Sequence, residues 1–354
     1  MLNIDIGRYS SILKEIERNE ASIFLIKKNG QSFDSNLNYL NKSSNSEYNT
    51  FYTDYKFYPI LEPYSPFCSL IKNFTNTKKD LDYLMNELSV YPAHKELFKS
   101  FIFNGKANRI EEILPFDYAY EKSRFFTEFL NFFNYYGKKK TLLITLENIN
   151  YAPISTINWL KWLFTNFSNN NFKIILTLND YHYYNENFQS NFDDLIQLLE
   201  LDGLLLEFSN KILINKTQSS DNNYINLNNS DNLFNGDNYY NFFALEEALN
   251  FYKINYDLIK ENNSKHTLEE LYLTLLKLGN TYCLLENYDE SLKYYELLSN
   301  VSLENGNDYF RLIAIQKLSM INILKKKFSL AETLSKQSYT LSKKLNNEEL
   351  IFNF

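Results

Sequence analysis

The stretch LLITLENINYAPISTINWLKWLF, residues 142–164, predicts a strand, a turn and a helix in immediate succession. Its first residues are mostly apolar up to Glu147, which is typical of a buried strand. A polar turn follows, and we expect a helix to open at Ser155. Asn148 comes directly after the acid, and its amide side chain cannot take up a proton. The strand therefore ends in one carboxylate and one neutral side chain.

Strands and helices alternate along the rest of the amino-terminal part. A helical pattern covers about 67–136, and its aromatic residues at 120–136 recur at the spacing of a core-facing helix. Further strands are predicted at 22–26, 50–55, 172–178 and 204–208. Strands separated by helices indicate a three-layer α/β domain with a mostly parallel sheet. We place this domain at residues 1–210.

The chain changes character after residue 210. Residues 211–240 are rich in Asn, Ser and Asp and indicate a linker or a surface loop, whereas residues 241–354 are helical in pattern. Within the helical part, the segment that begins at Leu278 superposes on the segment that begins at Leu318 with a shift of 40 residues. Repeats of this length indicate a solenoid of helical hairpins.

Small residues mark the same place in each copy. Ser291 corresponds to Ala331, and Ala248 takes that place in a weaker half-copy at 244–252, so the two helices of each hairpin can approach closely. The first copy resembles a tetratricopeptide repeat, although the period exceeds the usual length of about 34 residues. The residues that carry this resemblance are Leu275, Leu278, Gly279, Tyr282, Ser291 and Tyr295. An unrelated helical bundle is the alternative.

The resemblance implies that the helical part binds another protein or a peptide in a concave surface. Tyr282, Tyr294 and Tyr295 are candidate groove or packing residues, with packing favoured for Tyr282. The chain ends on EELIFNF, which is similar to the opening of another hairpin. We expect either that this segment caps the array or that residues 241–354 are an incomplete array.

The composition limits the classes of function. The 354 residues carry a formal net charge of −7, so contact of this segment with nucleic acid is disfavoured. No window approaches the ~20 apolar residues of a membrane span, and the amino terminus lacks the apolar stretch of a signal peptide. We therefore expect a cytoplasmic protein without membrane contact. Cys68 and Cys283 are expected to be free thiols in a reducing compartment.

Four stretches of residues 1–210 resemble, in their order and spacing, bacterial signal-transduction (STAND) ATPases, relatives of the AAA+ class that are often joined to tetratricopeptide arrays in regulators. They are Gly7–Arg8, YPILEPYSPF at 58–67, LENINYAPIST at 146–156 and KIILTLND at 173–180. The resemblance implies an α/β three-layer P-loop NTPase-like domain followed by an all-α helical-repeat domain.

A P-loop needs a GxxxxGKS/T turn, whose glycines admit the phosphates, whose Lys neutralises them and whose hydroxyl binds magnesium. In the matching register, Lys28 and Phe33 stand at the glycine places, Asp34 at the lysine place and Ser35 at the hydroxyl place. One charge pair is worth about 4 kcal/mol at 4 Å in an effective dielectric of about 20, so exchanging attraction for repulsion is a large loss. Only Ser35 remains as a nucleotide-binding residue.

The strand that ends at Glu147 also lacks one of the two acids that a P-loop ATPase carries there. The resemblance puts Glu147 at the place of the metal-associated acid and Asn148 at the place of the catalytic acid. Asn179 stands two positions after Thr177, where related proteins commonly carry Arg. We therefore predict no catalytic residue, no ATP hydrolysis and no cofactor, with Ser35 and Glu147 as a degenerate nucleotide site.

The alternative is an active ATP-binding switch, in which Ser35, Glu147 and either Lys27 or Lys28 bind Mg-ATP. Other enzyme chemistries are not indicated. His94, His182 and His266 have no zinc-ligand spacing, no nucleophile elbow is present, and we expect all three at the surface or at helix caps.

The sequence thus predicts a non-catalytic regulatory or scaffold protein of signalling or transcription control, which joins a pseudo-ATPase module to a protein-binding array. A second interpretation is the sensor part of a longer transcription regulator or cyclase. The sequence does not indicate an oligomeric state.

Overall fold

The computed structural model describes residues 23–28, 48–55, 63–65, 67–104, 115–166, 171–179, 192–198, 205–208, 232–261 and 266–345. The chain divides into two compact units. The sheet unit comprises Met1–Asn108 and Tyr120–Leu227, and the helical unit comprises Arg109–Ala119 and Asn228–Phe354.

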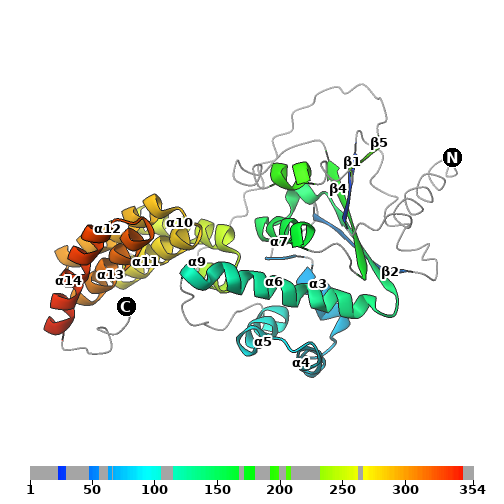
Figure 1. Cartoon of the computed structure of the whole chain (residues 1–354), viewed down its shortest axis with the longest axis horizontal. Coiled ribbons are helices and arrows are strands. Elements are labelled where there is room, and N and C mark those ends of the chain that lie inside the picture. The colour runs from blue at the N-terminus through cyan, green and yellow to red at the C-terminus, as the bar shows by residue number, and fades with distance from the viewer. Residues whose placement is uncertain are drawn as a thin grey trace. The chain divides into compact units, whose positions relative to one another are not determined.

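The sheet unit is built on a five-stranded sheet with the strand order β2-β3-β4-β1-β5 (Figure 1). Every neighbouring pair of strands is parallel, as the sequence predicted. The strands are β1 (Ile23–Lys28), β2 (Tyr48–Asp54), β3 (Thr141–Glu147), β4 (Phe172–Asn179) and β5 (Leu205–Phe208). All residues of β3 after Thr141 are buried, which suits a strand with a neighbour on each side and an apolar sequence.

The helices of the sheet unit begin with residues suited to that position. In α4, Thr77 accepts a hydrogen bond from the Asp80 N–H, and Asp80 accepts one from the Thr77 N–H, which completes a capping box. Pro92 opens α5 at a position that needs no N–H donor. The helices are α3 (Phe67–Phe74), α4 (Lys78–Glu87), α5 (Pro92–Lys99), the π-turn η2 (Ser100–Asn104), α6 (Pro115–Gly137), the 3-10 turn η3 (Ile149–Tyr151) and α7 (Ile154–Asn166). The residues of α6 up to Ala119 belong to the helical unit.

Aromatic side chains form much of the core of the sheet unit. Phe129 of α6 packs edge-on against Trp159 of α7, with ring centroids 5.5 Å apart. Phe67 of α3 lies 4.5 Å from the same indole ring, so one buried side chain joins three helices. The Phe residues of the 120–136 segment are buried, which confirms the predicted core face; they are Phe125, Phe126, Phe129, Phe132 and Phe133.

The helical unit is built from antiparallel helices, and its last four helices are each 17 residues long. Helices α11 and α13 begin at residues 268 and 308, and α12 and α14 begin at 288 and 328, a shift of 40 residues in both cases. The elements are α9 (Asn232–Asn241), α10 (Leu245–Glu261), α11 (Leu268–Leu284), α12 (Tyr288–Glu304), α13 (Asp308–Leu324) and α14 (Phe328–Lys344), drawn from yellow-green to red in Figure 1. The predicted helical hairpins with a 40-residue period are therefore present.

The predicted linker at 211–240 is wrong for its last residues, because residues 232–241 form α9. Gly236 of α9 lies under the ring of Tyr252 in α10, and a Cβ at this position would come within 2.4 Å of the ring. Asp237 accepts a hydrogen bond from the Tyr252 hydroxyl at 2.6 Å. Tertiary packing thus overrides a composition that predicts a loop.

Each loop between the repeated helices reverses the chain with one residue at positive φ. The φ values are 60° at Glu286, 69° at Gly306 and 58° at Lys326. In each loop the next N–H donates to the carbonyl five residues before it, at 2.7–2.9 Å: Asn287 to Tyr282, Asn307 to Ser302 and Lys327 to Asn322. This pattern is the Schellman ending of a helix.

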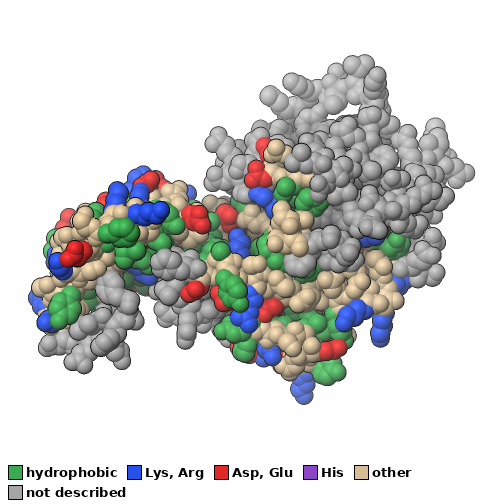
Figure 2. All heavy atoms as spheres, in the orientation of Figure 1, with side chains coloured by type: hydrophobic (Ala, Val, Ile, Leu, Met, Phe, Trp, Pro, Cys, Tyr) green, Lys and Arg blue, Asp and Glu red, His purple; other side chains and the backbone are tan. Residues whose placement is uncertain are grey.

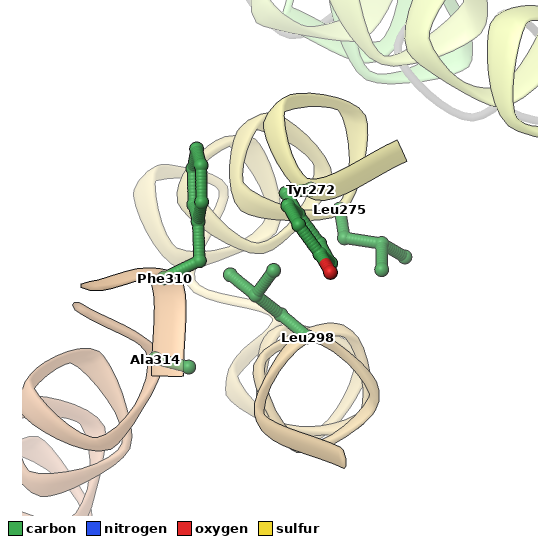
Figure 3. Close-up of a cluster of buried hydrophobic side chains, with 5 residues drawn as sticks. All are labelled: Tyr272, Leu275, Leu298, Phe310 and Ala314. Carbon is green, nitrogen blue, oxygen red and sulfur yellow. The ribbon is translucent and has the colours of Figure 1, made fainter. Parts of the chain in front are cut away.

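Small residues let the helices of a hairpin meet, as predicted. Ser291 is fully buried, and its hydroxyl donates to the Gly279 carbonyl at 2.7 Å. In the next hairpin the hydroxyl of Ser319 donates to the carbonyl of the buried Ala331 at 2.9 Å. Between hairpins, apolar side chains of α11, α12 and α13 form a cluster of Tyr272, Leu275, Leu298, Phe310 and Ala314 (Figure 3).

Candidate functional site

The carboxyl ends of β2, β3, β4 and β1 lie in that order along one edge of the sheet. Asp54 pairs with Glu147, and Lys28 pairs with Asn179, so the last residues of these strands stand in register. In parallel α/β sheets, ligand sites form outside the carboxyl ends of the strands. The topology therefore collects at one edge the strand ends on which sequence analysis placed Lys28, Glu147 and Asn179.

Asn148 makes the turn out of β3. Its φ of 55° and ψ of 50° lie in the left-handed region, which Asn adopts more readily than most residues. Its N–H donates to Thr177 Oγ1 on β4 at 3.2 Å, and its carbonyl accepts from the Tyr151 N–H at 2.9 Å. Asn148 is only 1% exposed. Asn148 therefore holds the turn between β3 and η3.

Glu147 is buried at the end of β3, with 1% of its surface exposed. The Tyr52 hydroxyl of β2 donates a hydrogen bond to Glu147 Oε2. Because Asp54 is the register partner of Glu147, Tyr52 is its diagonal cross-strand neighbour, a separation that aromatic side chains can bridge. A buried carboxylate needs such donors. Sequence analysis missed Tyr52, since no local pattern shows which strand lies beside β3.

A second set of contacts connects the first turn of α7 to the chain just before α3. The Tyr64 N–H donates to Ser155 Oγ at 3.2 Å, and Thr156 Oγ1 donates to the Ser65 carbonyl at 3.0 Å. The Tyr55 hydroxyl donates to the same carbonyl at 2.5 Å. Two of the stretches that carry the ATPase resemblance, 58–67 and 146–156, are thus in direct contact.

The other predicted nucleotide-site residues are placed less completely. Lys27 and Lys28 are the last two residues of β1, and Lys28 is aligned with Asn179 of β4. Phe33, Asp34 and Ser35 lie outside the described residues. The structure therefore places Glu147, Asn148 and Thr177 at the edge of the sheet, and Ser35 stays a prediction.

His94 is not at the surface, so that expectation is wrong. It lies on α5 with 2% of its surface exposed. Its Nδ1 is 2.5 Å from Glu128 Oε2 and its Nε2 is 3.5 Å from Glu121 Oε2, both on α6. Glu128 Oε1 also accepts the Tyr91 N–H at 2.8 Å. The contacts of His94 with these two glutamates join α5 to α6.

The described residues include one further histidine and both cysteines. His266 lies beside Glu270 at the start of α11, with Nδ1 3.0 Å from Oε2, and His182 lies outside the described residues. Cys68 and Cys283 are buried, and neither forms a disulfide, as expected. No group of three or more His, Cys, Asp and Glu side chains in the described part of the chain could hold a metal ion.

The tyrosines predicted for the helical unit are mainly packing residues. Tyr295 is fully buried, and its hydroxyl donates to Asn280 Oδ1 at 2.6 Å. Tyr282 is 8% exposed and stacks on Tyr294, with ring centroids 5.5 Å apart. Burial, and next the neighbouring Tyr282, raises the pKa of Tyr294 to about 12.

The first helices of two successive hairpins, α11 and α13, contact each other and share a row of half-buried side chains. The row, which we call the α11–α13 row, consists of Leu273, Lys277, Asn280, Ile313, Lys317 and Met320. Its members recur at the i, i+4, i+7 spacing of one helix face, and each residue of α11 has its counterpart 40 positions later in α13. Lys277 Nζ is 2.9 Å from Asp237 Oδ1, so α9 borders the same row.

Comparison with protein-family models and with curated proteins found no match to this chain. Within the described residues, the structure contains no helix that is both long enough and apolar enough to span a membrane.

Proposed function

We propose that this chain is a non-catalytic regulatory or scaffold protein in signalling or transcription control. In this proposal, a P-loop-like domain that has lost hydrolysis is joined to a tetratricopeptide-like array that binds a segment of another protein. The proposal includes no cofactor and no catalytic residue.

The observation that carries the proposal is the burial of Glu147 and its hydrogen bond with Tyr52. An acid that holds a metal-bound water must present its oxygens to a ligand, whereas Glu147 is 1% exposed and accepts a hydrogen bond from Tyr52. The adjacent position offers an amide, whose backbone is engaged with Thr177. The burial of Glu147 and the backbone bond of Asn148 support a role for both residues in holding the strand ends together, without activation of water.

The strand order supports the P-loop part of the proposal. β1 lies between β4 and β5, so its carboxyl end is next to that of β4 and one strand away from that of β3. This is the edge at which a nucleotide would need the phosphate turn and the acidic strand together. The topology suits nucleotide binding, and the side chains described at its edge do not suit hydrolysis.

The array supports the binding part of the proposal. The α11–α13 row combines the apolar Leu273, Ile313 and Met320 with the donors of Lys277, Asn280 and Lys317. Apolar contacts interspersed with a few polar groups are typical of surfaces that recognise peptides.

The test is binding and hydrolysis of Mg-ATP by the full chain, measured by equilibrium dialysis and phosphate release. We expect no hydrolysis above background, and no micromolar binding that depends on Glu147. The variants are Glu147→Gln, which keeps the volume of the side chain, and Glu96→Gln, a control at an exposed glutamate of the sheet unit. Hydrolysis or tight binding that Glu147→Gln removes and Glu96→Gln leaves intact would establish the active switch instead.

A further inference from the structure

Helix α14 exposes two aromatic side chains. The same two positions of α12, its counterpart 40 residues earlier, are half-buried. Phe328 is 64% exposed and Tyr339 is 49% exposed. Their counterparts 40 residues earlier, Tyr288 and Ser299 of α12, are half-buried. Tyr288 packs against a cluster that includes Leu318 and Ile321 of α13. Among the described residues, no helix covers in α14 the side that α12 uses against the next hairpin.

We call this side the α14 stripe and define it as Phe328, Glu332, Ser335 and Tyr339. Its members recur at the i, i+4, i+7, i+11 spacing of one helix face. In α12 the same positions hold Tyr288, Leu292, Tyr295 and Ser299, of which Tyr288 and Leu292 contact the apolar cluster beside α13. The stripe thus has the geometry of a surface that receives a helix.

Three exposed charges of the hairpin that ends with α14 are reversed relative to the preceding hairpin. Glu286, Glu296 and Glu304 of the preceding hairpin become Lys326, Lys336 and Lys344 at the positions 40 residues later. All six side chains are exposed. In Figure 2, hydrophobic, basic and acidic side chains lie beside one another on the visible face of the end that α13 and α14 form. A surface matched to α14 must therefore differ in charge from the helices inside the array.

Part of this positive charge is not neutralised within the described residues. Lys336 pairs with Glu332 at 2.5 Å, and Lys344 pairs with Asp308 at 2.7 Å. Lys343 lies over the Tyr339 ring, 4.4 Å from its centroid. Lys326, just before α14, has no acidic partner in the part of the chain that the structure describes, whereas the charge of Lys327 acts on Asp289 of α12.

We propose that the α14 stripe binds an amphipathic helix of a partner protein whose apolar face is flanked by acidic residues. Inside the array, α13 presents Phe310, Ala314, Leu318 and Ile321 to its neighbours, at i, i+4, i+8 and i+11, and the partner helix presents the same spacing. Contact of two α14 stripes from two copies would bring the lysines together, which disfavours symmetric self-association. This inference rests on the proposed protein-binding function of the array and names its partner class.

The experiment uses two peptides of this chain as probes for the full-length protein. The control peptide has the native sequence of residues 307–325, and the acidic peptide carries Arg311→Glu, Lys317→Glu and Lys325→Glu. In fluorescence anisotropy we expect the acidic peptide to bind at least tenfold more tightly than the control peptide. We also expect its affinity to fall as salt rises from 50 to 500 mM, because exposed charges are screened.

Protein variants then locate the contact. The double variant Lys326→Glu with Lys336→Glu should bind the acidic peptide at least fivefold more weakly than the native protein does. The double variant Phe328→Ser with Tyr339→Ser should no longer bind the acidic peptide more tightly than the control peptide. Tyr83→Ser, at a 71% exposed aromatic of the sheet unit, is the control and should change nothing. Circular dichroism establishes that each variant keeps its helix content.

Three results would overturn the inference. Equal affinity of the two peptides would remove the charge argument. Binding that is lost in Lys317→Glu but kept in both α14 variants would move the site to the α11–α13 row, and the proposed function would survive. Concentration-dependent dimerisation in analytical ultracentrifugation that Phe328→Ser abolishes would show that a second copy occupies the stripe.

Discussion

At the carboxyl end of β3, polar contacts join residues that are far apart in the chain, whereas in the helical unit similar contacts recur from hairpin to hairpin. Tyr52 and Glu147 are separated by 95 positions. In the helical unit, the bond from Ser291 to Gly279 and the bond from Ser319 to Ala331 both span 12 positions. The bond between Tyr52 and Glu147 has no equivalent elsewhere in the described residues. A contact of the second kind can be compared with its own repeat in one molecule.

The largest effect is expected in the aromatic core of the sheet unit, where one side chain serves several helices. Phe129→Ala should lower the free energy of unfolding by about 3–5 kcal/mol, because it removes a fully buried ring packed on Trp159. Urea denaturation measures the change. Tyr120→Ala on the same helix is the matched control, since Tyr120 is 66% exposed, and it should cost under about 0.5 kcal/mol. Equal costs for the two variants would contradict the described packing of α6.

The contrast between unique and repeated contacts explains what the sequence could predict. Helix positions in the array depend on apolar spacing within about 20 residues, and the 40-residue shift is visible in the sequence itself. The five strands were also visible, four as short apolar runs and β2 as a run of alternating aromatic residues. The pairing of Tyr52 with Glu147, however, depends on which strands are neighbours, and no local pattern fixes that choice.

Two errors have the same origin. The burial of His94 depends on Glu128, which lies 34 positions away on another helix. The helix at 232–241 depends on the ring of Tyr252, which covers Gly236. In both places the local sequence is polar or rich in Asn, so local propensity predicts a surface residue or a loop. Ser35 is a prediction that the described residues do not test.

The second prediction compares two tyrosine hydroxyls with different acceptors. Tyr52→Phe removes a donor to the buried carboxylate of Glu147 and should cost about 1.5–3 kcal/mol, because hydrogen bonds to charged groups are the stronger ones. Tyr295→Phe removes a donor to the neutral amide of Asn280 and should cost about 0.5–1.5 kcal/mol. Urea unfolding of both variants measures the difference.

Glu147→Gln provides the control for this pair. In that background, Tyr52→Phe should cost less than it does in the native chain, since the acceptor no longer carries a charge. If Tyr52→Phe has the same cost in both backgrounds, the hydroxyl does not stabilise the carboxylate, and the structural role assigned to Glu147 is wrong.

The third prediction tests the covariation inside the array. A Cβ on Gly279 would lie 2.4 Å from the Tyr295 ring, so Gly279→Ala should cost about 1–3 kcal/mol through overpacking. Forty residues later the same two places hold Ser319 and Ser335, whose hydroxyl oxygens are 2.9 Å apart. The repeat thus uses either glycine with a large ring or two small hydroxyl residues.

A double-mutant cycle measures this coupling. Gly279→Ala should be nearly neutral in a Tyr295→Ser background, because the ring that it would strike is gone. Thermal unfolding of the four proteins gives the interaction free energy. Additive costs would mean that the alternation between hairpins has no packing cause.

The smallest effect concerns the helix-reversing loops. Glu286 and Lys326 occupy positive φ, where residues with a Cβ are disfavoured, while Gly306 fills the same place between α12 and α13. Glu286→Gly should therefore raise the free energy of unfolding by a few tenths to about 1 kcal/mol, and Gly306→Ala should lower it by a similar amount. Urea unfolding checks both changes in parallel.

Asn148 separates this effect from a functional constraint, because it has the same backbone conformation at the end of β3, with φ of 55°. Asn148→Gly keeps the turn available but empties a buried site, so it should destabilise the chain where Glu286→Gly stabilises it. If both substitutions stabilise equally, the Asn148 side chain contributes nothing beyond its turn. A substitution at this edge of the sheet would then cost no more than one in a loop of the array.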